Sequence, residues 1–173
     1  MNKAVMISIH PKWCELIENG KKTIEVRKTK PKLEMPFKVY IYCTKSGGIR
    51  YNWIGDVWNG KVIGEFVCDR ITQYNCDRDY KEYFVAGYVG AYMPTQEMCL
   101  TQQDLVEYGQ GETLYGWHIS NLVIYDKPKE WDEFMHYKYF DWWDYGHHEN
   151  KRQRELCNLT RPPQSWCYLE EQK

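Results

Sequence analysis

The chain has 173 residues, of which 43% are hydrophobic and 27% charged, and its formal net charge is −1 at pH 7. This composition is ordinary for a folded globular protein, and it excludes a disordered chain, a collagen-like repeat and a coiled coil. The length predicts a single domain over residues 1–173. No apolar run reaches the length of about 18 residues that a membrane-spanning helix needs. The first ten residues carry no secretory signal, so we expect a cytoplasmic protein without a membrane partner.

Charge is unevenly distributed along the chain. Residues 1–50 carry 11 Lys and Arg against 4 Asp and Glu, whereas residues 51–149 carry 7 against 17. A basic amino-terminal segment beside an acidic middle segment predicts a local anion-binding face. A solvated surface with compensating charges is an equally good interpretation of the same pattern.

The cysteines give no sign of a metal or redox centre. There are seven of them, and no two form a C-x-x-C pair, which argues against a zinc ribbon or a redox motif. Without a secretory signal they are expected to be reduced thiols. Cys157 and Cys167, taken with His147 and His148, have a spacing that matches no familiar zinc site. We therefore expect no metal and no cofactor.

The first residues predict a strand, a helix and a second strand. Residues 4–10 form a short run rich in β-branched side chains, which is typical of a strand. Residues 11–19 begin with a proline suited to a first helical turn and have an apolar face at helical spacing. Residues 22–28 alternate, so that Glu25 and Arg27 share one face of a strand.

The remaining predicted elements are short. Strands are expected at residues 37–43, 61–68, 114–126 and 164–170. Helices are expected at residues 78–86, from residue 101 onwards, and at residues 129–134. Residues 44–60 form a long loop, and residues 136–160 form an insertion or a partly ordered arm. Because strands and helices do not alternate regularly, a doubly wound parallel sheet is disfavoured. We predict an α+β fold built on a small, mostly antiparallel β-barrel with flanking short helices.

Residues 20–27, GKKTIEVR, resemble the motif G-x-K-x-x-E-x-R of the ASCH domain family, a branch of the PUA-like superfamily. The match is complete at Gly20, Lys22, Glu25 and Arg27. Segments at residues 41–45, 61–69, 114–122 and 162–171 resemble a bacterial and phage subgroup of the same family. This resemblance implies a PUA-like fold with a cationic ligand-binding cleft beside the motif.

The residues in and near this motif suit the recognition of a nucleotide. Arginine offers a planar fork and lysine a point charge for phosphate, whereas glutamate accepts hydrogen bonds from an amine on a base. Trp13 and Trp117 could stack on a base. The alternative is a Glu25–Arg27 ion pair on a solvated face, with both tryptophans in the core. The candidate binding residues are Lys12, Trp13, Lys21, Lys22, Glu25, Arg27, Lys45, Tyr115 and Trp117.

Both binding and catalysis are compatible with the resemblance. The family that the chain resembles includes amidohydrolases that act on acetylated cytidine nucleosides, and it includes proteins proposed as ribonucleases. In the amidohydrolases the resemblance implies a lysine, which matches Lys22, and a threonine nucleophile at the position that Glu25 occupies here. A carboxylate cannot replace a hydroxyl that must be acylated, and a carboxylate between cations is a weak base at neutral pH. We therefore predict an RNA- or nucleotide-binding module whose ligand could be a modified base. A hydrolase with Lys22 and Glu25 as its catalytic residues is the alternative, and a protein-interaction module using the arm at residues 136–160 is a third possibility.

Overall fold

The computed structural model describes residues 3–45, 58–88, 91–144 and 146–172. The strands are β1 (Lys3–Ile9), β2 (Ile24–Arg27), β3 (Phe37–Cys43), β4 (Val62–Asp77), β5 (Glu82–Val85), β6 (Leu114–Lys129), β7 (Met135–Asp144), β8 (Glu149–Asn158) and β9 (Trp166–Glu170). The helices are α1 (Pro11–Glu18), α3 (Thr95–Met98), α4 (Gln102–Gly109) and the 3₁₀ helix η1 (Trp131–Glu133). None of these helices is both long and apolar enough to cross a membrane.

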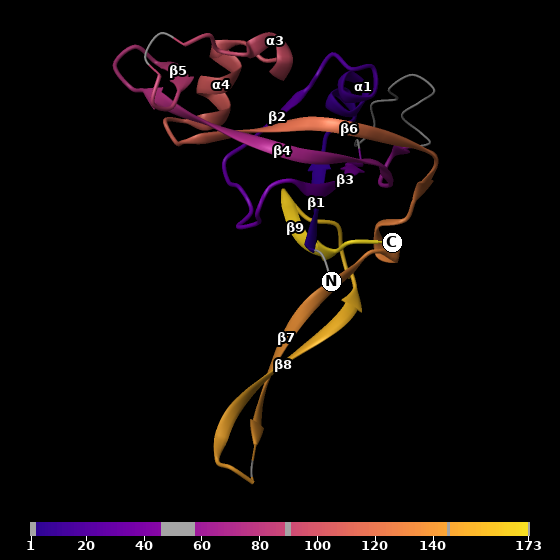
Figure 1. The fold of residues 1–173 in the computed structure, drawn as a ribbon. Helices are drawn as coiled ribbons and strands as arrows, with labels where there is room; N and C mark the ends of the chain where they lie inside the picture. The colour runs from indigo at the N-terminus through magenta and orange to yellow at the C-terminus, as the bar shows by residue number, and fades with distance from the viewer. Residues whose placement is uncertain (1–2, 46–57, 89–90, 145, 173) are drawn as a thin grey trace.

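A seven-stranded sheet forms the body of the molecule (Figure 1). Its strand order is β2-β6-β4-β3-β1-β9, and β5 pairs with β4. Only the pairing of β1 with β3 is parallel among the described strand pairs. Backbone pairing in the described part of the chain leaves β2 and β9 as the two ends of this path. The ends still meet through side chains, because Trp166 Nε1 of β9 donates to Thr29 Oγ1, just after β2, at 2.9 Å. The predicted α+β fold with mostly antiparallel strands is confirmed.

Apolar side chains from the first helix and the central strands form the main core. The amphipathic helix α1 buries Cys14 and Ile17, which pack with Ile7 of β1 and Ile41 of β3 in one cluster. Burial of such side chains is the dominant stabilising contribution to a fold of this size. A second cluster joins Leu105 of α4 to β2 and β6, and this cluster fixes α4 beside the motif strand.

Most of the predicted elements are present, but the helix predicted at residues 78–86 is wrong. Residues 82–85 form β5 instead, which pairs with the last residues of β4. The side chains of Tyr83, Phe84 and Val85 favour extended backbone, and β4 continues to Asp77 and offers them a partner strand. The helix predicted at residues 129–134 is shortened to the three residues of η1. Most of the predicted loop at residues 44–60 lies outside the described residues.

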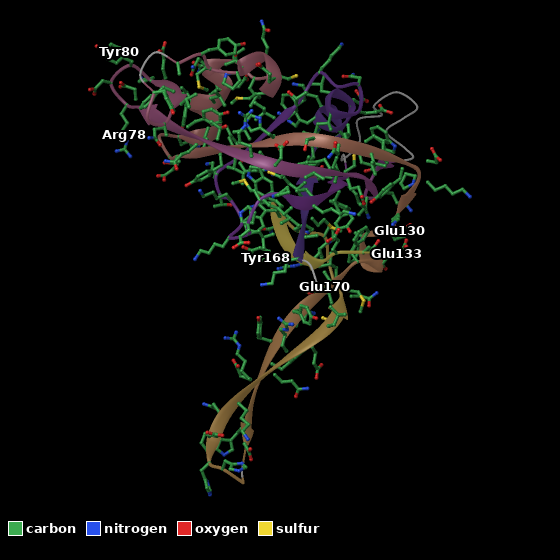
Figure 2. The ribbon with its side chains drawn as sticks, viewed as in Figure 1. Arg78, Tyr80, Glu130, Glu133, Tyr168 and Glu170 are labelled. Atoms are coloured by element: carbon green, nitrogen blue, oxygen red, sulfur yellow. The ribbon has the colours of Figure 1, made fainter. Side chains whose placement is uncertain are left out.

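The segment predicted as an insertion or partly ordered arm is a β-hairpin. Strands β7 and β8 pair antiparallel over ten residue pairs and form a sheet of their own. The hairpin projects from the body on the side away from α1 and α4 (Figure 1). Its root is fixed in the protein, because Phe134 is fully buried and accepts a hydrogen bond from the backbone N–H of Leu159 at 2.9 Å. Figure 2 shows Glu130 and Glu133 near this root and Arg78 and Tyr80 at the opposite end of the body.

Candidate ligand-binding site

A cavity of about 610 Å³ lies beside the motif strand. This volume falls within the range of about 300–1,000 Å³ that is usual for small-molecule sites. The lining residues come from the ends of β1 and β3 and from α1, β2 and α4, and they are Ser8, His10, Trp13, Lys22, Glu25, Val26, Arg27, Thr44, Leu100, Asp104, Glu107 and Tyr108. Four of the predicted binding residues, Trp13, Lys22, Glu25 and Arg27, therefore meet at one cavity.

The alternation of strand β2 explains how the motif reaches this cavity. Ile24 and Val26 are buried in the apolar cluster that also contains Leu105 of α4. Successive side chains of a strand point to opposite faces, so Glu25 and Arg27 lie on the other face. The sequence pattern predicted this arrangement correctly for the four residues of β2.

Lys22, Glu25 and Arg27 form a buried cluster of charges. Glu25 Oε1 lies 2.9 Å from Arg27 Nη2, and Glu25 Oε2 lies 3.4 Å from Lys22 Nζ. Lys22 Nζ also donates to the carbonyl of Met98 at 2.6 Å, and Arg27 Nη2 donates to the carbonyl of Ser8 at 2.5 Å. The side chains of Lys22 and Glu25 are only 2% and 8% exposed. These contacts hold the carboxylate in one orientation at the cavity wall, as a preorganised site requires.

One donor of this cluster is left without a partner. Arg27 Nε is buried and has no hydrogen-bond partner among the residues that the structure describes. A buried donor without a partner costs about 1–3 kcal/mol, so this part of the cluster lowers the stability of the fold.

Helix α4 gives the cavity a second wall of opposite charge. Asp104, Glu107 and Tyr108 lie at i, i+3 and i+4 and face the cavity together. The hydroxyl and backbone N–H of Thr101, which caps α4, donate to Asp104 and hold the pKa of that carboxyl below its usual value. Burial raises the pKa of Tyr108. The cavity is therefore not the cationic cleft that we predicted, because two cations on one side are offset by carboxylates on the other.

Trp13 lies at the edge of the same cavity with two ammonium groups near its ring. Lys12 Nζ is 4.4 Å and Lys22 Nζ is 5.0 Å from the ring centroid. Such distances are within the range of about 6 Å for a cation–π contact. Trp13 is half-buried, packs against the main core and also lines the cavity. Lys12, which is exposed, does not line the cavity but lies beside Trp13 at its rim.

The other predicted binding residues do not line the cavity. Lys21 and Lys45 are exposed, and Tyr115 is half-buried with Lys30 Nζ 5.3 Å from its ring centroid. Trp117 is fully buried and packs against the rings of Phe37 and Trp166, each at 5.9 Å between centroids. A buried ring offers no face to a base, so the stacking role predicted for Trp117 is corrected to core packing.

Sequence reasoning missed the contribution of α4 to the cavity. The spacing of Asp104, Glu107 and Tyr108 on a predicted helix was a signal that these side chains share a face. Nothing in the local sequence indicated that this face would lie against the motif strand. Ser8 and His10 were also missed, and they lie near the end of a predicted strand, where loops commonly carry functional residues.

Thr101→Ala is expected to lower the free energy of unfolding by about 1 kcal/mol, because it removes the helix cap of α4 and the hydroxyl that orients Asp104. Urea denaturation of the variant and the wild type measures this difference. Thr160→Ala, at an exposed position after β8, is the matched control and should be nearly neutral. Equal effects of the two substitutions would contradict a capping role for Thr101.

One group of side chains in the described residues has the chemistry of a metal site. Potential ligand atoms of Asp144, His147 and Glu149 lie within 4.8 Å of one another at the tip of the hairpin. However, Lys151 Nζ lies 2.5 Å from Asp144 Oδ2, so an ammonium group already neutralises the central carboxylate. These residues are far along the chain from the cavity and take no part in it.

Comparison with known proteins identifies relatives of this fold. A model of the ASCH domain matches residues 7–145, a range that contains every residue lining the cavity. Crystal structures of the ASCH protein from Zymomonas mobilis and of two single-residue variants are similar, with TM-scores of 0.51–0.52 and sequence identities of 19–20%. The alignments cover 97% of this chain and 88–91% of those chains. No curated protein matches the chain. At this level of identity the crystal structures demonstrate a shared fold and say nothing about the ligand.

Proposed function

Because this chain belongs to the ASCH domain family, we propose that its cavity binds one nucleotide unit, either of an RNA strand or as a free nucleotide. The observation that carries the proposal is the buried carboxylate of Glu25, held between Lys22 and Arg27 at the wall of the cavity. Residues fixed in this way present donors and an acceptor in a constant geometry, which favours recognition of one defined ligand.

The mixture of charges indicates which part of a nucleotide would lie inside. A phosphate would be attracted by Lys22 and Arg27 but repelled by Asp104 and Glu107 on α4. A base or a ribose offers both acceptors for the cations and amine or hydroxyl donors for the carboxylates. We therefore propose that the base and sugar occupy the cavity, with the phosphate at the rim near Lys12.

Two aromatic side chains are available to stack on such a base. Trp13 and Tyr108 both line the cavity, and Tyr108 is 40% exposed. Stacking on an aromatic side chain contributes about 1–3 kcal/mol per base. Stacking contributes similarly for every base. Discrimination between bases would therefore come from hydrogen bonds to Glu25 and Arg27.

Lys22→Met is expected to weaken nucleotide binding by about tenfold or more, since it removes a donor from the cavity and one of the two cations that orient Glu25. Isothermal titration calorimetry with the four ribonucleoside monophosphates and a short single-stranded RNA measures the effect. Lys21→Met is a matched control, because it removes the same charge from the adjacent exposed residue. Equal losses in the two variants, or no binding of any of these ligands to the wild type, would contradict the proposal.

A hydrolase is the second candidate function, and the proximity of Lys22 to Glu25 favours it. Their side chains lie 3.4 Å apart at the cavity wall, which is a suitable arrangement for proton transfer to a substrate. Thr23, the neighbouring threonine, does not line the cavity, so it does not supply the nucleophile expected of an amidohydrolase. Turnover of an acylated cytidine or a short RNA that Glu25→Gln abolishes, while circular dichroism shows the variant to be folded, would favour the hydrolase. Binding without turnover would favour the binding module.

A further inference from the structure

The β7–β8 hairpin has two chemically different faces. Residues that are directly opposite in an antiparallel pair share a face, and successive residues alternate between faces. The register therefore gives one face to Met135, Tyr137, Tyr139, Asp141 and Trp143 of β7, together with Asn150, Arg152, Arg154, Leu156 and Asn158 of β8. We call this the aromatic face of the hairpin. Lysine and glutamate side chains of the paired strands lie on the opposite face.

The aromatic face is exposed and carries two cation–π contacts. The guanidinium carbon of Arg154 lies 3.7 Å from the ring centroid of Tyr137, and that of Arg152 lies 4.5 Å from the ring centroid of Tyr139. Tyr139 is 56% exposed and Trp143 is 44% exposed. Tyrosine, tryptophan and arginine are the residues most enriched at the centres of protein interfaces. An isolated two-stranded hairpin is marginally stable in water, so a partner covering this face would stabilise it.

The two strands contribute complementary groups to the face. β7 supplies the aromatic rings and the carboxylate of Asp141, whereas β8 supplies both arginines. A twofold axis along the hairpin would place β7 of one copy against β8 of a second copy. Asp141 would then face Arg152 of the partner subunit, and Tyr139 would face Arg154 of the partner subunit. We propose that a second copy of this chain packs on the aromatic face in this way.

The charge of the hairpin favours a second copy over a nucleic acid. Residues 135–158 carry four Lys and Arg and four Asp and Glu, so the hairpin has no net charge with neutral histidines. Nucleic-acid binding depends on a surplus of cations, and Glu130 and Glu133 lie near the root of the hairpin (Figure 2). The aromatic face itself has Asp141 against Arg152 and Arg154, so two copies attract where each arginine meets a carboxylate or a ring of the other copy. The ten residue pairs give the hairpin a length of about 33 Å. A surface of this length and the width of two strands makes a small interface, so we expect the dimer to dissociate on dilution.

An exchange of charges between subunits tests this proposal on the full chain. Sedimentation velocity over a wide range of concentrations should show a monomer–dimer equilibrium for the wild type. Asp141→Arg and Arg152→Asp should each weaken the dimer by about tenfold or more, because each places like charges opposite one another across the interface. A mixture of the two variants should form a heterodimer, since both contacts between subunits are then between opposite charges.

The mixture separates contacts between subunits from the contact within one chain. Asp141 and Arg152 also lie 3.5 Å apart within the hairpin, and each variant keeps like charges at these two positions whether or not it is mixed. If the mixture forms a dimer where neither variant alone does, the recovered association arises only from contacts between chains. Phe140→Ser is the control, because Phe140 is exposed and follows Tyr139 on the opposite face, and this variant should remain dimeric. Circular dichroism melting checks that each variant is folded.

Three results would overturn the proposal. One is a wild type that remains monomeric at every concentration, and another is a single variant that dimerises as well as the wild type. The third is a mixture of the two charge variants that forms no heterodimer. If the wild type is monomeric and binds single-stranded RNA, and Arg154→Ala abolishes this binding, the aromatic face binds a nucleic acid and not a second copy.

Discussion

Replacing Glu25 with glutamine is expected to lower the free energy of unfolding by about 3–5 kcal/mol, the usual cost of removing one member of a buried charge cluster. Glutamine keeps the shape of the side chain but carries no charge. Lys22 and Arg27, whose side chains are 2% and 11% exposed, would then be neighbouring cations without a carboxylate between them. Such buried groups cannot recover their lost hydration from water. The charge of Glu25 therefore contributes more to the free energy of unfolding than its volume does.

Urea denaturation at neutral pH measures this difference, and Glu18→Gln provides the matched control. Glu18 is exposed at the end of α1, so its replacement should change the free energy of unfolding by no more than about 0.5 kcal/mol. The cost at Glu25 should also persist at high salt, because salt screens buried pairs much less than exposed ones. A Glu25→Gln protein as stable as the Glu18→Gln protein would show that the cluster is not held by charge.

The part of the cavity wall whose geometry was predicted correctly depends on local periodicity. Glu25 and Arg27 are two residues apart on one strand, so their shared face follows from the geometry of extended backbone. The second wall of the cavity depends on contacts between segments far apart in the chain. Asp104 and Tyr108 lie on one face of α4, but their approach to β2 requires Leu105 to pack in one apolar cluster with Ile24 and Val26. That packing is a property of the folded chain and has no signature within either segment.

The charge of the cavity also depends on segments that are far apart in the chain. The excess of lysine and arginine in residues 1–50 predicted a local anion-binding face, and the family resemblance implied a cationic cleft beside the motif. In the folded protein Glu107 and Asp104, which belong to the acidic middle segment, line the cavity with Lys22 and Arg27. Net charge over a segment therefore described the surface as a whole better than it described one site.

The hairpin was difficult to predict for a different physical reason. Strand prediction depends on an alternation between buried apolar and exposed polar residues. Both faces of β7 and β8 are largely exposed, since the hairpin projects from the body, so this alternation is absent (Figure 1). Tyr139 and Phe140, for example, are adjacent aromatic residues on opposite faces, and both are exposed. A ribbon whose two faces are both largely exposed has no single buried face to mark it.

The two tryptophans considered for base stacking should differ sharply when each is replaced by alanine. Trp117→Ala is expected to lower the free energy of unfolding by about 3–5 kcal/mol, because it empties a fully buried position between Phe37 and Trp166. Trp13→Ala should cost clearly less, since Trp13 is half-buried. It should instead weaken nucleotide binding by the loss of stacking, about 1–3 kcal/mol per base.

Urea denaturation and calorimetric titration with a nucleoside monophosphate, carried out on both variants, separate the two roles. Trp117→Phe retains most of the ring volume and should remain folded if Trp117→Ala does not, and its affinity for the nucleotide should equal that of the wild type. A Trp117→Phe protein that is folded but binds the nucleotide less tightly would mean that Trp117 contacts the ligand. Unchanged affinity after Trp13→Ala would remove Trp13 from the site and leave Tyr108 as the stacking residue, because Tyr108 is the other aromatic side chain that lines the cavity.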